Sequence, residues 1–203
     1  MKKLYFFFII SFLLFSSQVH AQREYQYPCG TYFISLNGTS DKGLWQGCYT
    51  SGDFTLSAWF QLRDEAWQGK EMDLFHRETY KFPNIDGLSL FIGTDGILGF
   101  RTYINKNNNS VLETISPGIK PEPFKWHHVA LSFKAGGSCQ LYYNGRSVAS
   151  GSFEGGRFID WNFPDFLSVG SKYINHVGGG HFATFKGYLD EVAFCEAALT
   201  QSQ

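Results

Sequence analysis

Three carboxylates lie close together in the segment KEMDLFHRE, residues 70–78. Glu71 and Asp73 are two residues apart, so on a β-strand their side chains point to the same face. Two carboxyls that stand roughly 5 to 5.5 Å apart can cleave a glycosidic bond, one as nucleophile and the other as acid/base. Glu78 lies at an odd spacing from Asp73, so on a regular strand it faces the other side. The spacing therefore supplies only part of such a mechanism.

The same segment also fits an ordinary half-buried strand. Met72, Leu74 and His76 would then face the core, whereas Glu71, Asp73 and Arg77 would face water. A third carboxylate in the alternating series would stand at position 75 or, with one bulge residue, at position 76. Those positions hold Phe75 and His76. The segment therefore predicts a strand rather than a catalytic site.

Histidine pairs raise the question of a metal site. His127 and His128 are adjacent, so on a strand they point to opposite faces and cannot chelate one ion. His176 and His181 flank a glycine-rich segment, but no third ligand is evident. This segment therefore predicts a surface loop rather than a metal site.

Aromatic residues near predicted loops suit sugar binding, because a flat ring can lie against the apolar face of a sugar. The candidates are Trp67, Tyr80, Tyr103, Trp161 and Tyr173. Two segments, residues 155–165 and 172–182, gather several of them with polar neighbours. We hypothesise a loop-borne ligand site there, formed by Trp161, Tyr173, His176 and His181.

Short strands separated by turn residues must position these groups. In residues 53–62, DFTLSAWFQL, one face carries five apolar side chains and the other carries Thr55, Ser57, Trp59 and Gln61. Residues 88–103 predict a hairpin that turns at Asp95-Gly96, and residues 126–143 predict another, followed by a turn at Asn144-Gly145. Many strands at this spacing predict an all-β sandwich of two antiparallel sheets.

The N-terminal segment, the length and the net charge of the chain limit the classes of protein to which it can belong. Residues 1–21 have two lysines, a 12-residue apolar run and a small-residue ending, which predicts a secretory signal peptide cleaved after Ala21. That run is too short for a membrane span, and no later run approaches the required length. We expect one secreted domain over residues 22–203. Without Lys2 and Lys3 the net charge is near −3, which argues against a nucleic-acid partner.

The cysteines and sequons fit an extracellular protein. Cys29, Cys48, Cys139 and Cys195 are even in number, and in an oxidising compartment they predict two disulfides. No CxxC pair points to a structural zinc site. Asn37 and Asn108 begin acceptor sequons, which would be glycosylated in a eukaryotic host.

Three segments together resemble the laminin-G-like family, whose fold is the concanavalin A-like jelly roll. They are GDFTLSAWFQL (52–62), KWHHVALSFKAGGSCQLYYNGRSVASG (125–151), and FLSVGS with FKGYLDEVAFCEAALT (166–171 and 185–200). The resemblance covers nearly all of the mature chain in the right order. It implies a two-sheet antiparallel jelly-roll sandwich, which in extracellular proteins is usually a module that binds glycans or other proteins.

The resemblance also implies roles for single residues. Trp126 would fill the core, and Asp190 and Glu191 would tie the last strand to neighbouring backbone amides. The first and last strands would run side by side, which favours Cys29–Cys195 with Cys48–Cys139, and the main competitor is Cys29–Cys48 with Cys139–Cys195.

Such modules often hold calcium, so the resemblance also points to possible oxygen ligands, namely Asp86, Asp95 and Asp165. Each of these aspartates sits beside a glycine or proline, where capping of a turn is the commoner role.

We therefore expect a secreted, noncatalytic module that binds extracellular glycan or protein and requires no cofactor. Some enzymes with this jelly roll carry Glu-x-Asp-x-Glu in a groove, so a polysaccharide hydrolase is the first alternative. A structural or adhesion fragment of a larger extracellular protein is the second.

Overall fold

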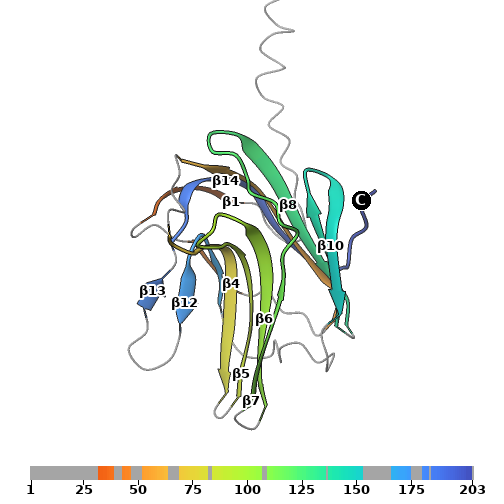
Figure 1. The fold of residues 1–203 in the computed structure, drawn as a ribbon. Helices are drawn as coiled ribbons and strands as arrows, with labels where there is room; N and C mark the ends of the chain where they lie inside the picture. The colour runs from red at the N-terminus through yellow and green to blue at the C-terminus, as the bar shows by residue number, and fades with distance from the viewer. Residues whose placement is uncertain are drawn as a thin grey trace, which may run out of the picture.

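The computed structural model describes residues 32–38, 43–46, 52–63, 69–81, 84–106, 109–135, 137–152, 166–174, 180–182 and 184–202. The regular elements of these residues are β-strands (Figure 1). They are β1 (Tyr32–Asn37), β2 (Gly43–Gln46), β3 (Phe54–Leu62), β4 (Met72–Lys81), β5 (Asn84–Ile92), β6 (Leu98–Lys106), β7 (Asn109–Ile115), β8 (Trp126–Phe133), β9 (Ser138–Tyr143), β10 (Arg146–Ser152), β11 (Phe166–Val169), β12 (Lys172–Ile174), β13 (Gly180–Phe182) and β14 (Lys186–Cys195). Within the described parts of the chain, no helix has the length and apolarity needed to cross a membrane.

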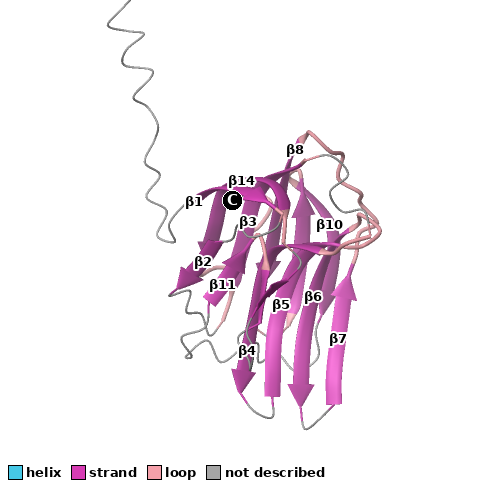
Figure 2. Cartoon of the chain, turned by 90° about the vertical axis from the view of Figure 1, so that its left-hand side faces the viewer, coloured by secondary structure: helices cyan, strands magenta, loops and turns pink. Residues whose placement is uncertain are grey.

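Two six-stranded antiparallel sheets form the body of the fold. Sheet A has the strand order β1-β14-β3-β8-β9-β10, and sheet B has the order β2-β11-β4-β5-β6-β7. The six strands of sheet B run side by side in Figure 2, and β12 and β13 form a separate two-stranded ribbon. The predicted all-β jelly-roll sandwich is confirmed.

The core lies between the inner faces of the two sheets. Sheet A contributes, among others, Phe54, Phe60 and Leu131, and sheet B contributes Leu90 and Phe100, all fully buried. In a strand alternate side chains point to one face, so this burial forces the residues between them outward. The sandwich therefore has two outer faces, one on each sheet, where a ligand site can form.

Turn residues join the strands as the sequence predicts. Gly96 ends the β5–β6 turn with a φ of 80°, and Asn144 and Gly145 form the β9–β10 turn with φ values of 48° and 74°. Positive φ at both central residues is typical of a tight hairpin turn. The proline-rich segment 117–124 follows β7 and carries the chain from sheet B to sheet A.

The cysteines lie in different environments. Cys139 points into the core, where burial raises its pKa to about 12, and Cys195 lies at the end of β14 on the outer face of sheet A. Both thiols are free in the structure, and Cys29 and Cys48 lie outside the described residues. β9 and β14 are separated by β3 and β8, which places their backbones about 14 Å apart at the usual strand spacing. A disulfide requires Cα atoms within about 7 Å, so the alternative pairing Cys139–Cys195 does not fit this sheet.

We predict a Cys29–Cys195 disulfide in the secreted protein. The first and last strands pair antiparallel with Tyr32 opposite Val192, as the family resemblance implies. Counting three residues outward from this pair along each strand reaches Cys29 and Cys195. Directly opposed cysteines of an antiparallel pair are close enough to be bridged. A nonreducing digest should contain the peptide that links them.

The same digest tests the Cys48–Cys139 pairing, which also stays a prediction. A Cys29 recovered with a free thiol, or linked to Cys48, would contradict the register argument. Alkylation before digestion is the control against disulfide exchange.

Candidate functional site

The outer face of sheet A is built by alternate residues of neighbouring strands. Because Phe54, Leu56, Ala58, Phe60 and Leu62 of β3 are fully buried, the intervening Thr55, Ser57, Trp59 and Gln61 face outward. Strand pairing then sets rows of side chains across the sheet. One row is Tyr188–Gln61–Trp126, the next is Asp190–Trp59–His128, and the third is Ala193–Ser57–Ala130–Tyr142.

Large apolar side chains gather at one end of this face. Among the described residues, the exposed large hydrophobic side chains are Trp59 at 37%, Phe124 at 69%, Trp126 at 44% and Tyr188 at 36% exposure. We call these four residues the aromatic platform. The rings of Trp126 and Tyr188 lie 6.5 Å apart, and the Arg63 guanidinium lies 5.9 Å from the Tyr188 ring. An exposed group of rings of this kind marks a binding surface.

The backbone holds Phe124 in an unfavourable conformation. Phe124 has a φ of 62°, which is rare for a bulky residue. Its N–H donates to the Leu62 carbonyl at 2.9 Å, and the Gln61 side-chain amide donates to the Phe124 carbonyl at 3.2 Å. These two bonds fix the backbone of Phe124 at the edge of the platform. Strain that the surroundings enforce in this way is typical of functional sites.

A buried histidine supports the platform from beneath. His127 points inward, and its Nε2 donates to the Glu122 carbonyl at 2.9 Å because a carbonyl can only accept. Its Nδ1 therefore accepts from the Tyr143 hydroxyl at 2.6 Å. Burial, with the nearby Glu122 charge, raises the pKa of Tyr143 to about 12 and keeps this donor protonated. The network anchors the segment that carries Phe124 and Trp126.

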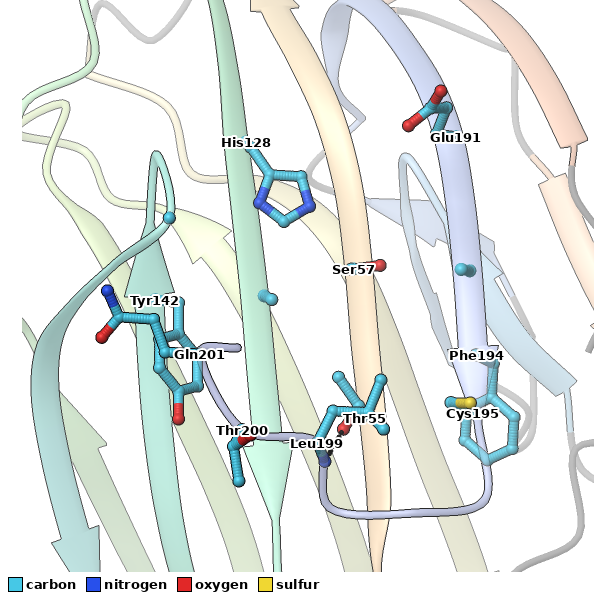
Figure 3. Close-up of a pocket in the computed structure, with 13 residues that line it drawn as sticks. Thr55, Ser57, His128, Tyr142, Glu191, Phe194, Cys195, Leu199, Thr200 and Gln201 are labelled. Carbon is cyan, nitrogen blue, oxygen red and sulfur yellow. Dashed lines mark hydrogen bonds between the residues drawn. The ribbon is translucent and has the colours of Figure 1, made fainter. Parts of the chain in front are cut away.

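A hollow of about 290 Å³ adjoins the platform on the same face (Figure 3). Its floor is the row Ala193–Ser57–Ala130, where three adjacent strands all carry small side chains. Tyr142 stands at the end of this row on β9. The hollow exists because the larger Trp59 and His128 occupy the next row.

Residues 197–201 close the end of the hollow that lies away from the platform. Thr55, which is almost completely buried, donates its hydroxyl to the Ala197 carbonyl at 2.7 Å and accepts the Leu199 N–H at 2.9 Å. Leu199, Thr200 and Gln201 then line the hollow (Figure 3). One hydroxyl therefore fastens this segment to β3.

His128 and Glu191 set the electrostatics of the hollow. They stand on either side of Ser57, and His128 also packs against Trp59 with ring centroids 5.2 Å apart (Figure 3). Burial lowers the pKa of His128, and the Glu191 charge offsets part of this effect. The imidazole is therefore neutral at pH 7. Glu191 has a φ of 46° at an irregularity of β14, and its N–H donates to the Asp190 carboxylate at 2.7 Å.

That hydrogen bond fits the structural role that the resemblance implies for Asp190. Trp126, by contrast, does not fill the core. It lies opposite the outward Gln61, and the adjacent His127 takes the inward position. The prediction that His127 and His128 face opposite sides is confirmed.

Asp73 of β4 lies on the outer face of sheet B, opposite Phe91 of β5, and Glu71 comes directly before this strand. The pairing of β4 with β5 shifts between Asp73 and Phe75, so the regular alternation is lost there. Met72 and Leu74 are in the core as predicted, but Asp73 and Arg77 are 0% and 1% exposed, so the prediction that they face water is wrong. The shift also places His76 on the face of Asp73, because His76 pairs with Ser89.

These carboxylates are held by neighbouring side chains. The Ser89 hydroxyl donates to Asp73 at 2.9 Å, and His76 Nδ1 lies 3.2 Å from the other Asp73 oxygen. The Arg101 guanidinium makes two bonds to Glu71, at 3.0 and 2.8 Å, and lies 4.0 Å from the centre of the Phe91 ring. The side chain of Glu78 is not described.

Five of the predicted ligand-binding, metal and glycosylation residues lie outside the described parts of the chain. Trp67, Trp161, His176, Asp165 and Asn108 are not among the described residues, so those predictions stay open. Only backbone is described for five others, which are Tyr80, Asp86, Tyr103, Tyr173 and His181. The backbones of Tyr173 and His181 are register partners in the pairing of β12 with β13, so the structure places two predicted ligand residues opposite each other.

Asp95 and Asn37 are described. Asp95 accepts the Ile97 N–H at 3.0 Å and so caps a turn, the commoner role expected for it. Asn37 is exposed at the end of β1. Within the described ranges, no three His, Cys, Asp or Glu side chains are grouped for a metal ion.

Sequence reasoning missed the platform, although part of its signal was visible. The alternation of β3 places Trp59 outward, as expected. The other rings belong to strands far away in the chain, and only the pairing of β14, β3 and β8 brings them together.

Comparisons with known proteins agree with this fold. A family model described as the concanavalin A-like lectin/glucanases superfamily matches residues 37–203. No curated protein sequence matches the chain. A CBM40 module of the Ruminococcus gnavus IT-sialidase, solved with α2,3-sialyllactose, superposes with a TM-score of 0.63 and 14% identity, over 85% of this chain and 96% of that one.

Two further structures share the fold. The heptameric SAP-like pentraxin of Limulus polyphemus matches with a TM-score of 0.53 and 18% identity, over 83% of this chain and 77% of that one. The NanB sialidase of Streptococcus pneumoniae matches with a TM-score of 0.61 and 16% identity. That match covers 85% of this chain but 26% of the sialidase.

We predict that Thr55→Val loosens residues 197–201. Valine keeps the shape of threonine but removes the hydroxyl, so the Leu199 N–H and the Ala197 carbonyl lose their partner. The free energy of unfolding should fall by about 1 to 2 kcal/mol, as measured by urea denaturation. Amide exchange at Leu199 should also accelerate. Thr55→Ser, which keeps the hydroxyl, is the matched control, and a valine variant as stable as the wild type would refute the fastening role.

We also predict a pH effect from His128. Its pKa is lower in the folded than in the unfolded state, so the unfolded chain binds the proton more readily. The stability that depends on neutral His128 is complete above about pH 6.5 and is lost as the pH falls from there through the folded pKa. As the pH is lowered, the melting temperature of the wild type should therefore fall more steeply than that of His128→Gln. Parallel declines would contradict this prediction.

Proposed function

We propose that this chain, which belongs to the concanavalin A-like lectin/glucanases superfamily, is a noncatalytic module that binds extracellular glycans through the aromatic platform of sheet A. The observation that carries the proposal is the gathering of Trp59, Phe124, Trp126 and Tyr188 at one end of one face. The extracellular location rests on the predicted signal peptide, residues 1–21.

The chemistry of the platform suits a sugar. A sugar ring has apolar C–H faces, which pack against aromatic rings, and hydroxyls around its edge, which need hydrogen-bond partners. Gln61 lies between Trp126 and Tyr188 in one row, and Asp190 and His128 flank Trp59 in the next. Rings and polar groups therefore alternate over the distance of a few side chains.

Rigid placement of the rings favours binding. Trp59, Trp126 and Tyr188 stand on strands inside a hydrogen-bonded sheet, and two backbone-anchoring bonds hold Phe124. Side chains that are already ordered lose little further freedom when a ligand binds. The platform therefore fits a ligand that gains its affinity from stacking on a preformed surface.

Proteins of similar fold support the proposal that the chain binds a glycan, without indicating which one. One of them is a carbohydrate-binding module solved with sialyllactose. Identities below one fifth relate these proteins by fold, so the sugar bound by this chain has to be argued from its own residues.

The carboxylate contacts favour binding over hydrolysis. Asp73 is fully buried, and Glu71 is held by two bonds to Arg101, so neither presents a free carboxylate at the surface. On sheet A, the Asp190 carboxylate accepts the N–H of Glu191. A retaining hydrolase needs two carboxyls on opposite sides of the scissile bond. The sialidase match spans 26% of that enzyme, which is compatible with an accessory domain.

A protein partner is the second candidate, because an exposed aromatic patch also suits adhesion. The two candidates differ in the ligand and not in the surface. A direct binding experiment with purified glycans distinguishes them.

We predict that Trp126→Ala abolishes most glycan binding. Loss of a central tryptophan from a binding surface typically costs about 2 kcal/mol or more, which corresponds to roughly a 30-fold loss of affinity. A glycan array should identify the class of sugar that the wild type binds, and titration calorimetry should measure the loss. Trp126→Phe should keep a large part of the affinity, because a ring remains.

Two controls complete this test. Arg146→Ala, an exposed change on β10, should bind like the wild type, and all variants should melt like it. Wells read for released reducing sugars should stay silent. Sugar release that Glu71→Gln removes would instead establish the hydrolase alternative, and an array without any bound glycan would leave the protein partner.

A further inference from the structure

The hollow beside the platform is placed to contact the same ligand. Trp59 and Ser57 are two residues apart on β3, a separation of about 6.8 Å along the strand, which is the scale of one sugar ring. His128 belongs both to the platform row and to the lining of the hollow. A sugar that stacks on Trp59 therefore brings its neighbour over the small side chains of the floor.

The dimensions of the hollow limit what can enter it. Its volume of about 290 Å³ lies at the small end of ligand pockets. Residues 197–201 close one end, and Tyr142 and Glu191 stand at its sides (Figure 3). The floor is apolar apart from Ser57, and the rim offers hydroxyl and amide groups from Tyr142, Thr200 and Gln201. This combination suits one sugar residue, with an apolar face and polar edges.

The charge of the hollow selects among sugars. Glu191 is the only formally charged side chain at pH 7 among the described residues that line it, because burial lowers the pKa of His128. Arg63, the cation of the platform, lies near Tyr188 and not in the hollow. A carboxylate that entered the hollow would meet Glu191 without a compensating cation.

We propose that the hollow is a subsite for one uncharged sugar residue and that Glu191 disfavours a residue that carries a carboxylate. This inference rests on the proposed glycan-binding function and deepens it. It separates the chain from the module of the same fold that was solved with sialyllactose, an acidic glycan.

The test compares ligands that differ by one group. The first ligand is a neutral oligosaccharide that the wild type binds on the array. The second is the same oligosaccharide with its terminal primary alcohol oxidised to a carboxylate, and the third is the methyl ester of the second. Two unit charges about 5 Å apart in water change an affinity by about fourfold. The wild type should therefore bind the carboxylate about fourfold more weakly than the methyl ester, and added salt should reduce the difference.

Variants assign the effect to the hollow. Glu191→Gln should bind carboxylate and methyl ester equally, and Glu191→Lys should prefer the carboxylate. Glu196→Gln removes an exposed carboxylate that does not line the hollow, so it should keep the wild-type preference. Ala193→Leu fills the floor and should weaken binding of all three ligands by about tenfold or more, a loss typical of a poorly accommodated group. Melting curves confirm that each variant is folded.

The outcomes separate this inference from the proposed function. Glycan binding that depends on Trp126, but is equal or tighter for the acidic ligand, overturns the inference and leaves the proposed function standing. An array on which the wild type binds only acidic glycans does the same. If no glycan binds, or if Trp126→Ala binds as well as the wild type, the proposed function fails and the inference fails with it.

Discussion

Strand β3 lies inside sheet A, between β14 and β8, and its five inward side chains from Phe54 to Leu62 are completely buried. Burial of this set is the constraint on which the site depends. A shift of one residue would expose all five side chains and bury the outward ones instead. Exposing the two phenylalanines and two leucines of this set would cost roughly 6 to 12 kcal/mol, which is comparable with the whole free energy of unfolding of a typical domain. The outward direction of Thr55, Ser57 and Trp59 is therefore fixed by the core and not by the ligand.

Departures from regular backbone geometry cluster around the same face. Glu191 and Phe124 are two of the three non-glycine residues with positive φ in the described chain, and both border the outer face of sheet A. At Glu191 the register of β14 against β3 shifts, which turns a carboxylate toward the hollow. Phe124 lies at the end of the proline-rich segment 117–124, just before β8 begins. The regular sheet supplies the floor and the rings, and these two irregular positions supply a charge and an edge.

Alternation and turn chemistry made much of the fold predictable. Both hairpins and the inward face of β3 follow from local patterns, whereas the pairing of the first and last strands was implied by the family resemblance. The faces of His76 and Arg77 could not be predicted, because the one-residue shift between Asp73 and Phe75 reverses the alternation after it and has no distinctive sequence signal. The platform was missed for another reason. An outward Trp59 alone is unremarkable, and its partners Trp126 and Tyr188 are distant in sequence and meet it only through strand pairing.

The two outer faces of the sandwich differ in how they use their polar groups. On sheet B, Ser89 donates a hydrogen bond to Asp73, and Arg101 makes two bonds to Glu71. A ligand there would have to displace charge-assisted bonds that are already formed, which is costly in a buried setting. On sheet A the rings of the aromatic platform are exposed to solvent, and polar groups stand around the hollow. A ligand there covers apolar surface without breaking an ion pair among the residues of the platform and hollow. The energetic balance therefore favours sheet A as the binding face.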